Sequence, residues 1–283
     1  MLTVLSALKL ASEYFEKKGI SSSRANAEIL LANTLNCKRL DLYLKFDQPL
    51  KEIEVEIFRQ YIARRGKYEP VQYIVGNTEF YGLILEVNPS VLIPRPETEI
   101  LVETILNEVN AADAPMILDI GCGSGNISIA LAKNIPNAEI FSVDISEAAI
   151  EVAQNNARKN NAQNINFIIG NIVSNDLLNE YFFDVIVSNP PYVGIDDYNS
   201  LHTEITSYEP VFAVTDNEDG LKFYRKISEI AAERLKKCGK LFFEIGFGQS
   251  SNVHKIMFDQ GFEEIKIVKD YQRINRVIYG IKK

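Results

Sequence analysis

The first stretch of the chain has apolar residues at helical spacing. They recur every three or four positions over residues 1–70, as in amphipathic helices that share a core. The serines at positions 21–23 offer N-cap oxygens for the second of these helices. We therefore predict a helical bundle over 1–70, which serves either as a structural cap or as a docking module for a partner. The predicted apolar stripes are Leu5, Leu8 and Phe15; Ala27, Leu30, Leu31 and Leu35; and Ile53, Ile57, Phe58, Tyr61 and Ile62.

After position 70 the pattern changes to alternation between apolar and polar residues. Val71–Val75 and Leu83–Ile93 have the period of strands, and Gly82 and Asn88 mark turns. These residues predict a β-hairpin linker over 71–94. The stretch Glu97–Asn110 then returns to helical spacing.

Strands and helices alternate from residue 116 onward. Such alternation predicts an α/β fold, in which helices cover both faces of a largely parallel sheet. The last two strands have no helix between them, so we expect them to form an antiparallel edge. This seven-stranded domain would occupy residues 95–283. Its predicted strands are Met116–Ile120, Glu139–Asp144, Ile165–Gly170, Asp184–Asn189, Leu241–Ile245, Glu264–Val268 and Arg276–Ile281, with helices near 125–134, 147–160, 220–237 and 249–260.

The composition indicates a globular protein that works in a reducing compartment. Of the 283 residues, 46% are hydrophobic and 24% are charged, which is inconsistent with a disordered or fibrous chain. No apolar run reaches the length of a membrane span, and the first residues do not form a secretory signal. The cysteines Cys37, Cys122 and Cys238 lie far apart and are odd in number, which argues against a disulfide framework or a zinc site. We expect a cytoplasmic protein without a metal.

Charge is unevenly divided along the chain. Residues 1–85 carry a net charge of +2, whereas the remainder carries −10. A protein that binds duplex DNA needs a basic surface to replace the phosphate counterions. The acidic larger part therefore disfavours free duplex DNA as a ligand and leaves open a protein partner or a small cationic one.

The first strand of the predicted sheet runs into a glycine-rich loop. Asp119 precedes this loop, and Asn126 stands where a dinucleotide-binding fingerprint has its third glycine. The pattern therefore disfavours a nicotinamide oxidoreductase. It suits a nucleoside with a cationic amino-acid tail, such as S-adenosylmethionine, whose ammonium Asp119 can anchor. The loop residues are Gly121, Cys122, Gly123, Ser124 and Gly125.

Asp144 ends the second strand of the sheet. A carboxylate at this place can accept hydrogen bonds from both ribose hydroxyls of a nucleoside. Its alternative role is to cap the helix that begins near Ser146.

The most specific local signal is Asn189-Pro190-Pro191-Tyr192, directly after an apolar strand. The two prolines stiffen the backbone and remove two N–H donors. The acceptors that remain are the side-chain oxygen of Asn189 and the carbonyl of Pro190, which together can hold a planar NH2 group by both hydrogens. Tyr192 offers a flat face for a planar substrate. Such a clamp would act by positioning and by oriented dipoles.

Together with the glycine loop, this tetrapeptide resembles the motifs of methyltransferases that act on planar amino groups. The narrower resemblance, which runs from the N-terminal helices to the end of the chain, is to the PrmC/HemK-type peptide chain release factor glutamine methyltransferases. Its most specific element is Arg95-Pro96-Glu97-Thr98-Glu99. The other supporting stretches are 70–76, Glu79-Phe80-Tyr81-Gly82, Tyr208-Glu209-Pro210, Asp219-Gly220-Leu221 and Arg276-Val277.

The resemblance implies a Rossmann-like methyltransferase domain that uses S-adenosylmethionine. The methyl acceptor would be the side-chain amide nitrogen (N5) of the glutamine in the Gly-Gly-Gln loop of class I release factors. Residues 121–125 and Asp144 match the cofactor site, and Asn189 matches the residue that touches both methyl donor and substrate amide. Pro190, Pro191 and Tyr192 match the rest of the substrate clamp. The helical domain would dock the release factor.

One stretch departs from the family pattern. After the third strand the family usually has Gly-Asp followed by an aromatic residue, whereas this chain has Gly170-Asn171-Ile172. Asn171 can still accept from the adenine amino group through its amide oxygen. Ile172 can cover a face of the base without aromatic stacking. Both residues therefore belong to the predicted cofactor site.

Other assignments remain open from the sequence. Arg95 and Glu97 either cap the following helix or help to close the pocket. An adenine-amino methyltransferase acting on nucleic acid would need a basic surface or a separate recognition region, and the sequence indicates neither. A non-catalytic interaction protein with the same fold would explain Asn171 and Ile172 as drift.

Overall fold

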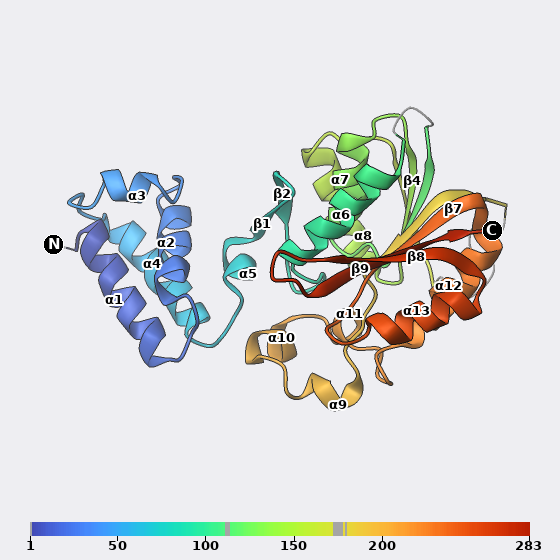
Figure 1. Ribbon diagram of the computed structural model, residues 1–283. Helices are drawn as coiled ribbons and strands as arrows, with labels where there is room; N and C mark the ends of the chain where they lie inside the picture. Colours follow the sequence, from blue (N-terminus) through green and yellow to red (C-terminus); the bar gives the residue numbers. More distant parts are fainter. Residues whose placement is uncertain (1, 111–113, 172–177, 179) are drawn as a thin grey trace. The chain divides into compact units, whose positions relative to one another are not determined.

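The computed structural model describes residues 2–110, 114–171, 178 and 180–283 (Figure 1). The chain divides into two compact units, one made of residues 1–77 and 202–208 and the other of residues 78–201 and 209–283. The smaller unit has an apolar core of its own, and the larger has a core on each face of its sheet. Within the described ranges, no helix is both long and apolar enough to cross a membrane.

The smaller unit is a helical bundle around one apolar core, as the sequence predicted. Leu8, Phe15 and Leu30 are fully buried in it. The predicted stripes are too wide, because Leu5 and Ile53 are 44% and 64% exposed. The predicted serine cap is wrong, because Ser22 precedes the second helix without a side-chain capping bond. The helices of this unit are α1 (Val4–Lys17), α2 (Ser23–Thr34), α3 (Asp41–Leu44), α4 (Glu52–Arg65), α5 (Val71–Val75) and α10 (Thr203–Tyr208).

The segment Val71–Val75 is helical, so its prediction as a strand is wrong. Its amides bond within the segment, with the Ile74 N–H donating to the Pro70 carbonyl at 3.1 Å. Gly76 ends the turn in the left-handed conformation, with φ of 79°. A five-residue apolar run fits a buried strand and a buried helical turn equally well, so periodicity alone could not separate them.

The larger unit begins with a hairpin of β1 (Asn77–Phe80) and β2 (Leu83–Glu86), whose first residue still belongs to the smaller unit. The hairpin was predicted, but it is shorter than residues 71–94. Its tight turn places Tyr81 and Gly82 both at positive φ, as in the type I′ turn that is common in two-residue hairpins. Asn156 fixes the hairpin to the domain by accepting from the Glu86 N–H and donating to the Glu86 carbonyl.

A seven-stranded sheet forms the middle layer of the larger unit, in the order β5-β4-β3-β6-β7-β9-β8. The first five strands in this order pair in parallel, and β9 pairs antiparallel with both β7 and β8. The predicted fold class, including the antiparallel edge, is confirmed. The strands are β3 (Met116–Ile120), β4 (Glu139–Asp144), β5 (Ile165–Ile169), β6 (Phe183–Ser188), β7 (Leu235–Glu244), β8 (Phe262–Lys269) and β9 (Asn275–Lys282).

Helices cover both faces of this sheet (Figure 1). Consecutive strand residues point to opposite faces, so Ile117 packs in the core beneath α6 and α7, whereas Leu118 packs beneath α12 and α13. The predicted helix over 220–237 is too long, because α12 ends at Arg234 and Leu235 already pairs with Phe183 of β6. The helices of this unit are α6 (Pro96–Glu108), α7 (Asn126–Asn134), α8 (Glu147–Lys159), α9 (Ile195–Tyr198), α11 (Val211–Val214), α12 (Lys222–Arg234) and α13 (Ser250–Asp259).

Candidate active site

The strand register brings the predicted site residues to one edge of the sheet. Ile120 at the end of β3 pairs with Val143 of β4 on one side and with Ser188 of β6 on the other. The glycine loop after Ile120 and the Asn189 loop after Ser188 therefore leave the sheet from neighbouring positions. This is the carboxyl edge, where ligands of open α/β sheets bind.

The glycine loop folds back over the end of β4. Gly121, Gly123 and Gly125 all have positive φ, between 53° and 79°. The Gly121 N–H donates to the Val143 carbonyl at 2.8 Å, and the Gly123 N–H donates to Asp144 Oδ2 at 2.9 Å. A Cβ at Gly121 or Gly123 would meet no atom within 4 Å, so this part of the loop has open space above it.

Asp119 is fully buried, although the sequence predicted that it would anchor a cationic group. Its Oδ2 accepts from the hydroxyl of Ser128, whereas its Oδ1 has no hydrogen-bond partner among the residues that the structure describes. Burial raises the pKa of Asp119 to about 7, the Ser128 bond lowers it, and the nearby Asp144 raises it further. The orphaned oxygen gives this carboxyl one strong acceptor position for a bound donor or water.

Asp144 already holds the loop around it. Its Oδ1 accepts from the Ser146 N–H at 2.9 Å, and its Oδ2 accepts from Gly123. Each carboxylate oxygen has two lone pairs, so both can accept a further bond. Ser146, not Asp144, caps α8 through its own hydroxyl. The alternative capping role for Asp144 is therefore taken by its neighbour.

The remaining predicted cofactor residues differ in accessibility. Asn171 is exposed just after β5, and Ile172 lies outside the described residues. Ser124 and Cys122 are buried. Burial raises the pKa of the Cys122 thiol well above its usual value, and Asp119 and Asp144 act in the same direction. The thiol is therefore kept neutral, as expected of a packing residue and not of a nucleophile.

The loop that carries Asn189 is fixed on both sides. The Ser188 hydroxyl donates to the Ile120 carbonyl at 2.7 Å, which ties this loop to the start of the glycine loop. Downstream, Gln249 Nε2 donates to the Tyr192 carbonyl at 2.8 Å and to the Gly220 carbonyl at 3.2 Å. The diproline segment is thus rigid through its neighbours as well as through its own rings.

The Asn189 side chain has a defined orientation. Its Nδ2 donates to the Thr98 hydroxyl at 3.2 Å, so its Oδ1 points away from Thr98. No residue that the structure describes donates a hydrogen bond to Asn189 Oδ1 or to the Pro190 carbonyl. The two oxygens named from the sequence as a clamp are therefore both available as acceptors.

Tyr192 is half-buried and contacts Glu244, a buried carboxyl that was not predicted from the sequence. Its hydroxyl donates to Glu244 Oε1 at 3.4 Å, and the Thr98 hydroxyl donates to Glu244 Oε2 at 2.6 Å. Burial raises the pKa of Glu244 to about 7, while the Thr98 bond and Arg276 lower it. Burial beside Glu244 also raises the pKa of Tyr192, so its hydroxyl keeps its proton.

Glu244 could have been found in the sequence. It follows the apolar run Leu241–Phe243 at the end of a strand, the same pattern that identified Asp119 and Asp144. Thr98 was named only as part of the family motif, because a threonine in the first turn of a helix carries no chemical signal of its own.

Arg95 and Glu97 were predicted either to cap the following helix or to help close the pocket, and the structure gives their contacts. The Arg95 side chain forms an ion pair with Glu209, which is buried, and makes no capping bond to α6. The same Glu209 accepts from the Ile93 N–H at 3.2 Å. Glu97 lies in the first turn of α6, where the helix dipole favours an acid.

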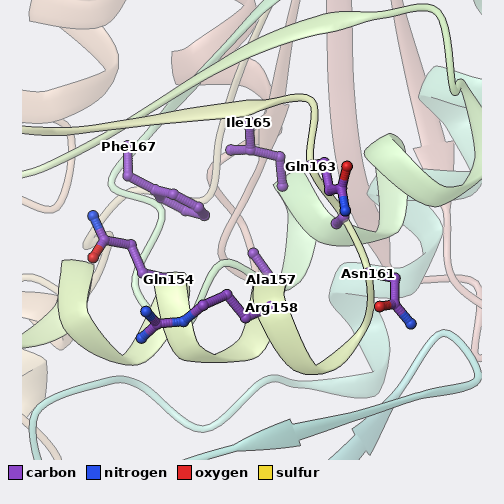
Figure 2. A pocket seen from close by; sticks show the side chains of 8 residues that line it. Gln154, Ala157, Arg158, Asn161, Gln163, Ile165 and Phe167 are labelled. Atoms are coloured by element: carbon purple, nitrogen blue, oxygen red, sulfur yellow. The ribbon is translucent and has the colours of Figure 1, made fainter.

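A cavity of about 420 Å³ lies elsewhere, between α8 and the amino end of β5 (Figure 2). Gln154 and Arg158 of α8 face Phe167 of β5 across it. Of the predicted site residues that the structure describes, none lines this cavity. The cavity is therefore separate from the candidate site at the carboxyl edge of the sheet.

Comparison with known proteins assigns both parts of the chain. Residues 6–76 match a family model described as the PrmC N-terminal domain, and residues 113–240 match one described as a methyltransferase domain. A release factor glutamine methyltransferase from Fusobacterium nucleatum is 41% identical over 95% of this chain and 76% of its own. The chain belongs to the release factor glutamine methyltransferase family. Another member, from Geobacter sulfurreducens, is 41% identical over 98% of this chain and 96% of its own.

The fold alone is also shared with more distant enzymes. A solved methyltransferase from Pyrococcus furiosus is 22% identical to this family member and aligns with a TM-score of 0.54, covering 71% of this chain and 89% of that one. The larger unit is therefore a methyltransferase domain in both sequence and architecture.

Proposed function

We propose that this enzyme transfers a methyl group from S-adenosylmethionine to the side-chain amide nitrogen (N5) of the glutamine in the Gly-Gly-Gln loop of class I release factors. One observation carries the proposal: Ile120 pairs with Ser188, so the Asn189 loop and the glycine loop leave the sheet from neighbouring positions. The family relatives, named for release factor glutamine methylation, support the same substrate.

The residues at the glycine loop fit S-adenosylmethionine. Space above Gly121 and Gly123 admits the amino-acid tail, and the unpartnered Oδ1 of Asp119 can accept from its ammonium directly or through a water. The spare lone pairs of Asp144 suit two ribose hydroxyls, and Asn171 is accessible for the adenine amino group. When bound, this cofactor supplies an electrophilic methyl group on a sulfonium.

The Asn189 loop would make an amide nitrogen reactive by positioning it. That nitrogen is a poor nucleophile because its lone pair is delocalised into its carbonyl. Asn189 Oδ1 and the Pro190 carbonyl can each accept one N–H of the substrate amide, while Pro191 stiffens the loop and Tyr192 borders it. With both N–H bonds held, the nitrogen lone pair can turn toward the methyl donor. The N–C bond would form as the S–C bond breaks, S-adenosylhomocysteine would leave as the neutral thioether, and the surplus proton on nitrogen would pass to water.

The smaller unit is proposed to dock the release factor. It matches the PrmC N-terminal domain, and residues 1–85 carry a net positive charge that would help to attract an acidic partner surface. A translation factor as substrate implies that the enzyme works in the cytoplasm.

The test is to incubate the enzyme with methyl-labelled S-adenosylmethionine and, side by side, a class I release factor, duplex DNA and RNA. We expect label in the release factor alone, with mass spectrometry showing one added methyl on the loop glutamine. Label in a nucleic acid would instead support the adenine-amino alternative. No heat of binding on calorimetric titration with S-adenosylmethionine would support a non-catalytic role.

A further inference from the structure

The hydroxyl of Thr98 lies between Glu244 and Asn189. It donates to Glu244 Oε2 at 2.6 Å and accepts from Asn189 Nδ2 at 3.2 Å. Thr98 and Glu244 are both 1% exposed, so neither side chain can exchange these partners for bulk water. These three residues come from α6, from the end of β7 and from the loop after β6.

While Glu244 is ionised, counting hydrogens fixes the direction of both bonds. An ionised carboxylate only accepts hydrogen bonds, so the single hydroxyl hydrogen of Thr98 must point toward Glu244. Only the lone pairs of Thr98 then face Asn189, and these can be met only by an N–H. The amide of Asn189 is therefore held with its nitrogen inward and its oxygen outward.

We propose that Thr98 and Glu244 are positioning residues that set the amide orientation of Asn189, so that its oxygen faces the substrate. Neither residue needs to touch the substrate. A flipped Asn189 would present its NH2 group to the NH2 group of glutamine, two donors facing each other, and the clamp would lose one of its two acceptors. The inference rests on the proposed function, since the amide substrate is what makes the orientation matter.

The orientation depends on the charge of Glu244. Its carboxyl faces Tyr192 from the β6 loop, Arg276 from β9 and Glu97 from α6, while Tyr224 of α12 donates to the Glu244 backbone carbonyl. Burial leaves the pKa of this carboxyl near 7. Once protonated, Glu244 can donate to Thr98, which frees the threonine hydrogen to turn toward a flipped Asn189. Ionised Glu244 thus enforces the active orientation.

The first test compares steady-state methylation of a release factor by Thr98→Val and Thr98→Ser enzymes. Valine keeps the shape and removes the hydroxyl, so we expect kcat to fall about 10- to 100-fold. The dissociation constant for S-adenosylmethionine should stay within about twofold, because Thr98 is not among the proposed cofactor residues. Serine restores the hydroxyl and should restore kcat to within about threefold.

Thr104→Val is the matched control. Thr104 is another buried threonine of α6, and its hydroxyl donates only to the Ile100 carbonyl of its own helix. We expect its kcat to equal that of the wild type. A Thr98→Val enzyme as fast as this control would overturn the inference, as would a Thr98→Ser enzyme as slow as Thr98→Val.

The second test is the pH profile of Glu244→Gln. Glutamine can offer its amide oxygen to Thr98 at every pH, so the variant should keep kcat within about threefold at pH 9. We expect the kcat of the wild type to fall below about pH 7, where Glu244 takes up a proton, and this fall should be smaller in the variant. Protonation of Asp119 in the same pH range would lower kcat in both enzymes alike. Identical profiles would overturn the inference. If the wild type transfers no methyl to the release factor at all, the proposed function fails instead.

Discussion

At the scale of single residues, Asn189 carries the largest share of the proposed chemistry. Its Oδ1 is one of the two free acceptors of the clamp, and its backbone follows the strand residue that pairs beside the glycine loop. We expect Asn189→Ala to lower kcat for release factor methylation at least about 100-fold, the usual cost of removing an oriented dipole from a reacting group.

Cofactor binding should largely survive the same change. Calorimetry with S-adenosylmethionine is expected to give a dissociation constant within about fivefold of the wild type, because Asp119, Asp144 and the glycine loop remain. Methylation at the normal rate would show that the role assigned to Asn189 is wrong.

Two buried acids should make the stability of the protein depend on pH. Burial raises the pKa of Asp119 from 3.8, and that of Glu244 from 4.5, to about 7 in each case. Each group holds a proton in the folded state that it loses in the unfolded state, so its contribution is full below the unfolded pKa and is lost as pH rises through about 7. The free energy of unfolding should fall by about 1.4 kcal/mol per pH unit and per group between about pH 5 and 7.

Asp119→Asn isolates one of these two contributions. Asparagine cannot titrate, so urea unfolding without cofactor should show a pH slope smaller by about 1.4 kcal/mol per unit. Glu147→Gln, which changes an exposed acid on α8, serves as the control and should leave the slope unchanged. A slope as steep in Asp119→Asn as in the wild type would contradict the assignment of a raised pKa to Asp119.

Sequence patterns pointed to the candidate residues at the carboxyl edge of the sheet, but not to the buried residues that contact them. Asp119 is the last residue but one of β3, Asp144 ends β4 and Asn189 follows β6, and the shared edge of a parallel sheet then brings them together. Thr98 and Glu244 are far apart in the chain and meet only through tertiary packing. No local spacing in the sequence encodes such a contact, although the position of Glu244 at the end of an apolar strand could have marked it as a candidate site residue.

At the scale of elements, Gly220 shows how a loop can depend on one glycine. It has φ of +77°, and a Cβ there would lie 2.5 Å from the Tyr192 carbonyl oxygen, which is closer than real atoms approach. Gly220→Ala should therefore displace Tyr192 and with it the Asn189 loop. We expect kcat to fall at least about tenfold, and the free energy of unfolding to fall by about 2 kcal/mol.

Gly248→Ala separates the clash from the backbone strain. Gly248 has nearly the same φ, +80°, but a Cβ there would meet nothing within 4 Å. The Gly248→Ala variant should therefore have the backbone strain of a positive φ without a steric clash, and its kcat should stay near the wild-type value. Equal kcat values for the two variants would show that the contact with Tyr192 does not hold the loop.

Element type was predictable wherever a run was long and its period clear. The strands β3 and β4, which contain Ile120 and Asp144, end where the sequence predicted, because the strands of a central parallel sheet are mostly apolar. The five residues of α5 were too few to show a period, and the strand β7 begins inside the predicted helix because Leu235 is recruited by pairing with β6. Tertiary contacts decided both cases.

At the scale of the whole molecule, the smaller unit contains a segment that interrupts the larger one in the sequence. Residues 202–208 lie between two stretches of the methyltransferase unit, yet they belong to the helical unit. Within that unit, Arg65 is 2% exposed and forms an ion pair with Glu204 of this segment. Arg65 also donates to Asn26 Oδ1 at 2.7 Å, so a buried guanidinium joins α2, α4 and α10.

Removing Glu204 should therefore loosen the helical unit while sparing the methyltransferase unit. Glu204→Ala leaves a buried charge without its partner, which we expect to cost about 3 kcal/mol. Amide hydrogen exchange should accelerate in α1, α2 and α4, and it should stay unchanged in β3 and β6. The control is Asp259→Ala on α13, whose partner Lys255 lies in a largely exposed pair worth little stability. Unchanged exchange in α2 and α4 would mean that the segment contributes nothing to the helical unit, and faster exchange in β3 would mean that the two units do not unfold separately.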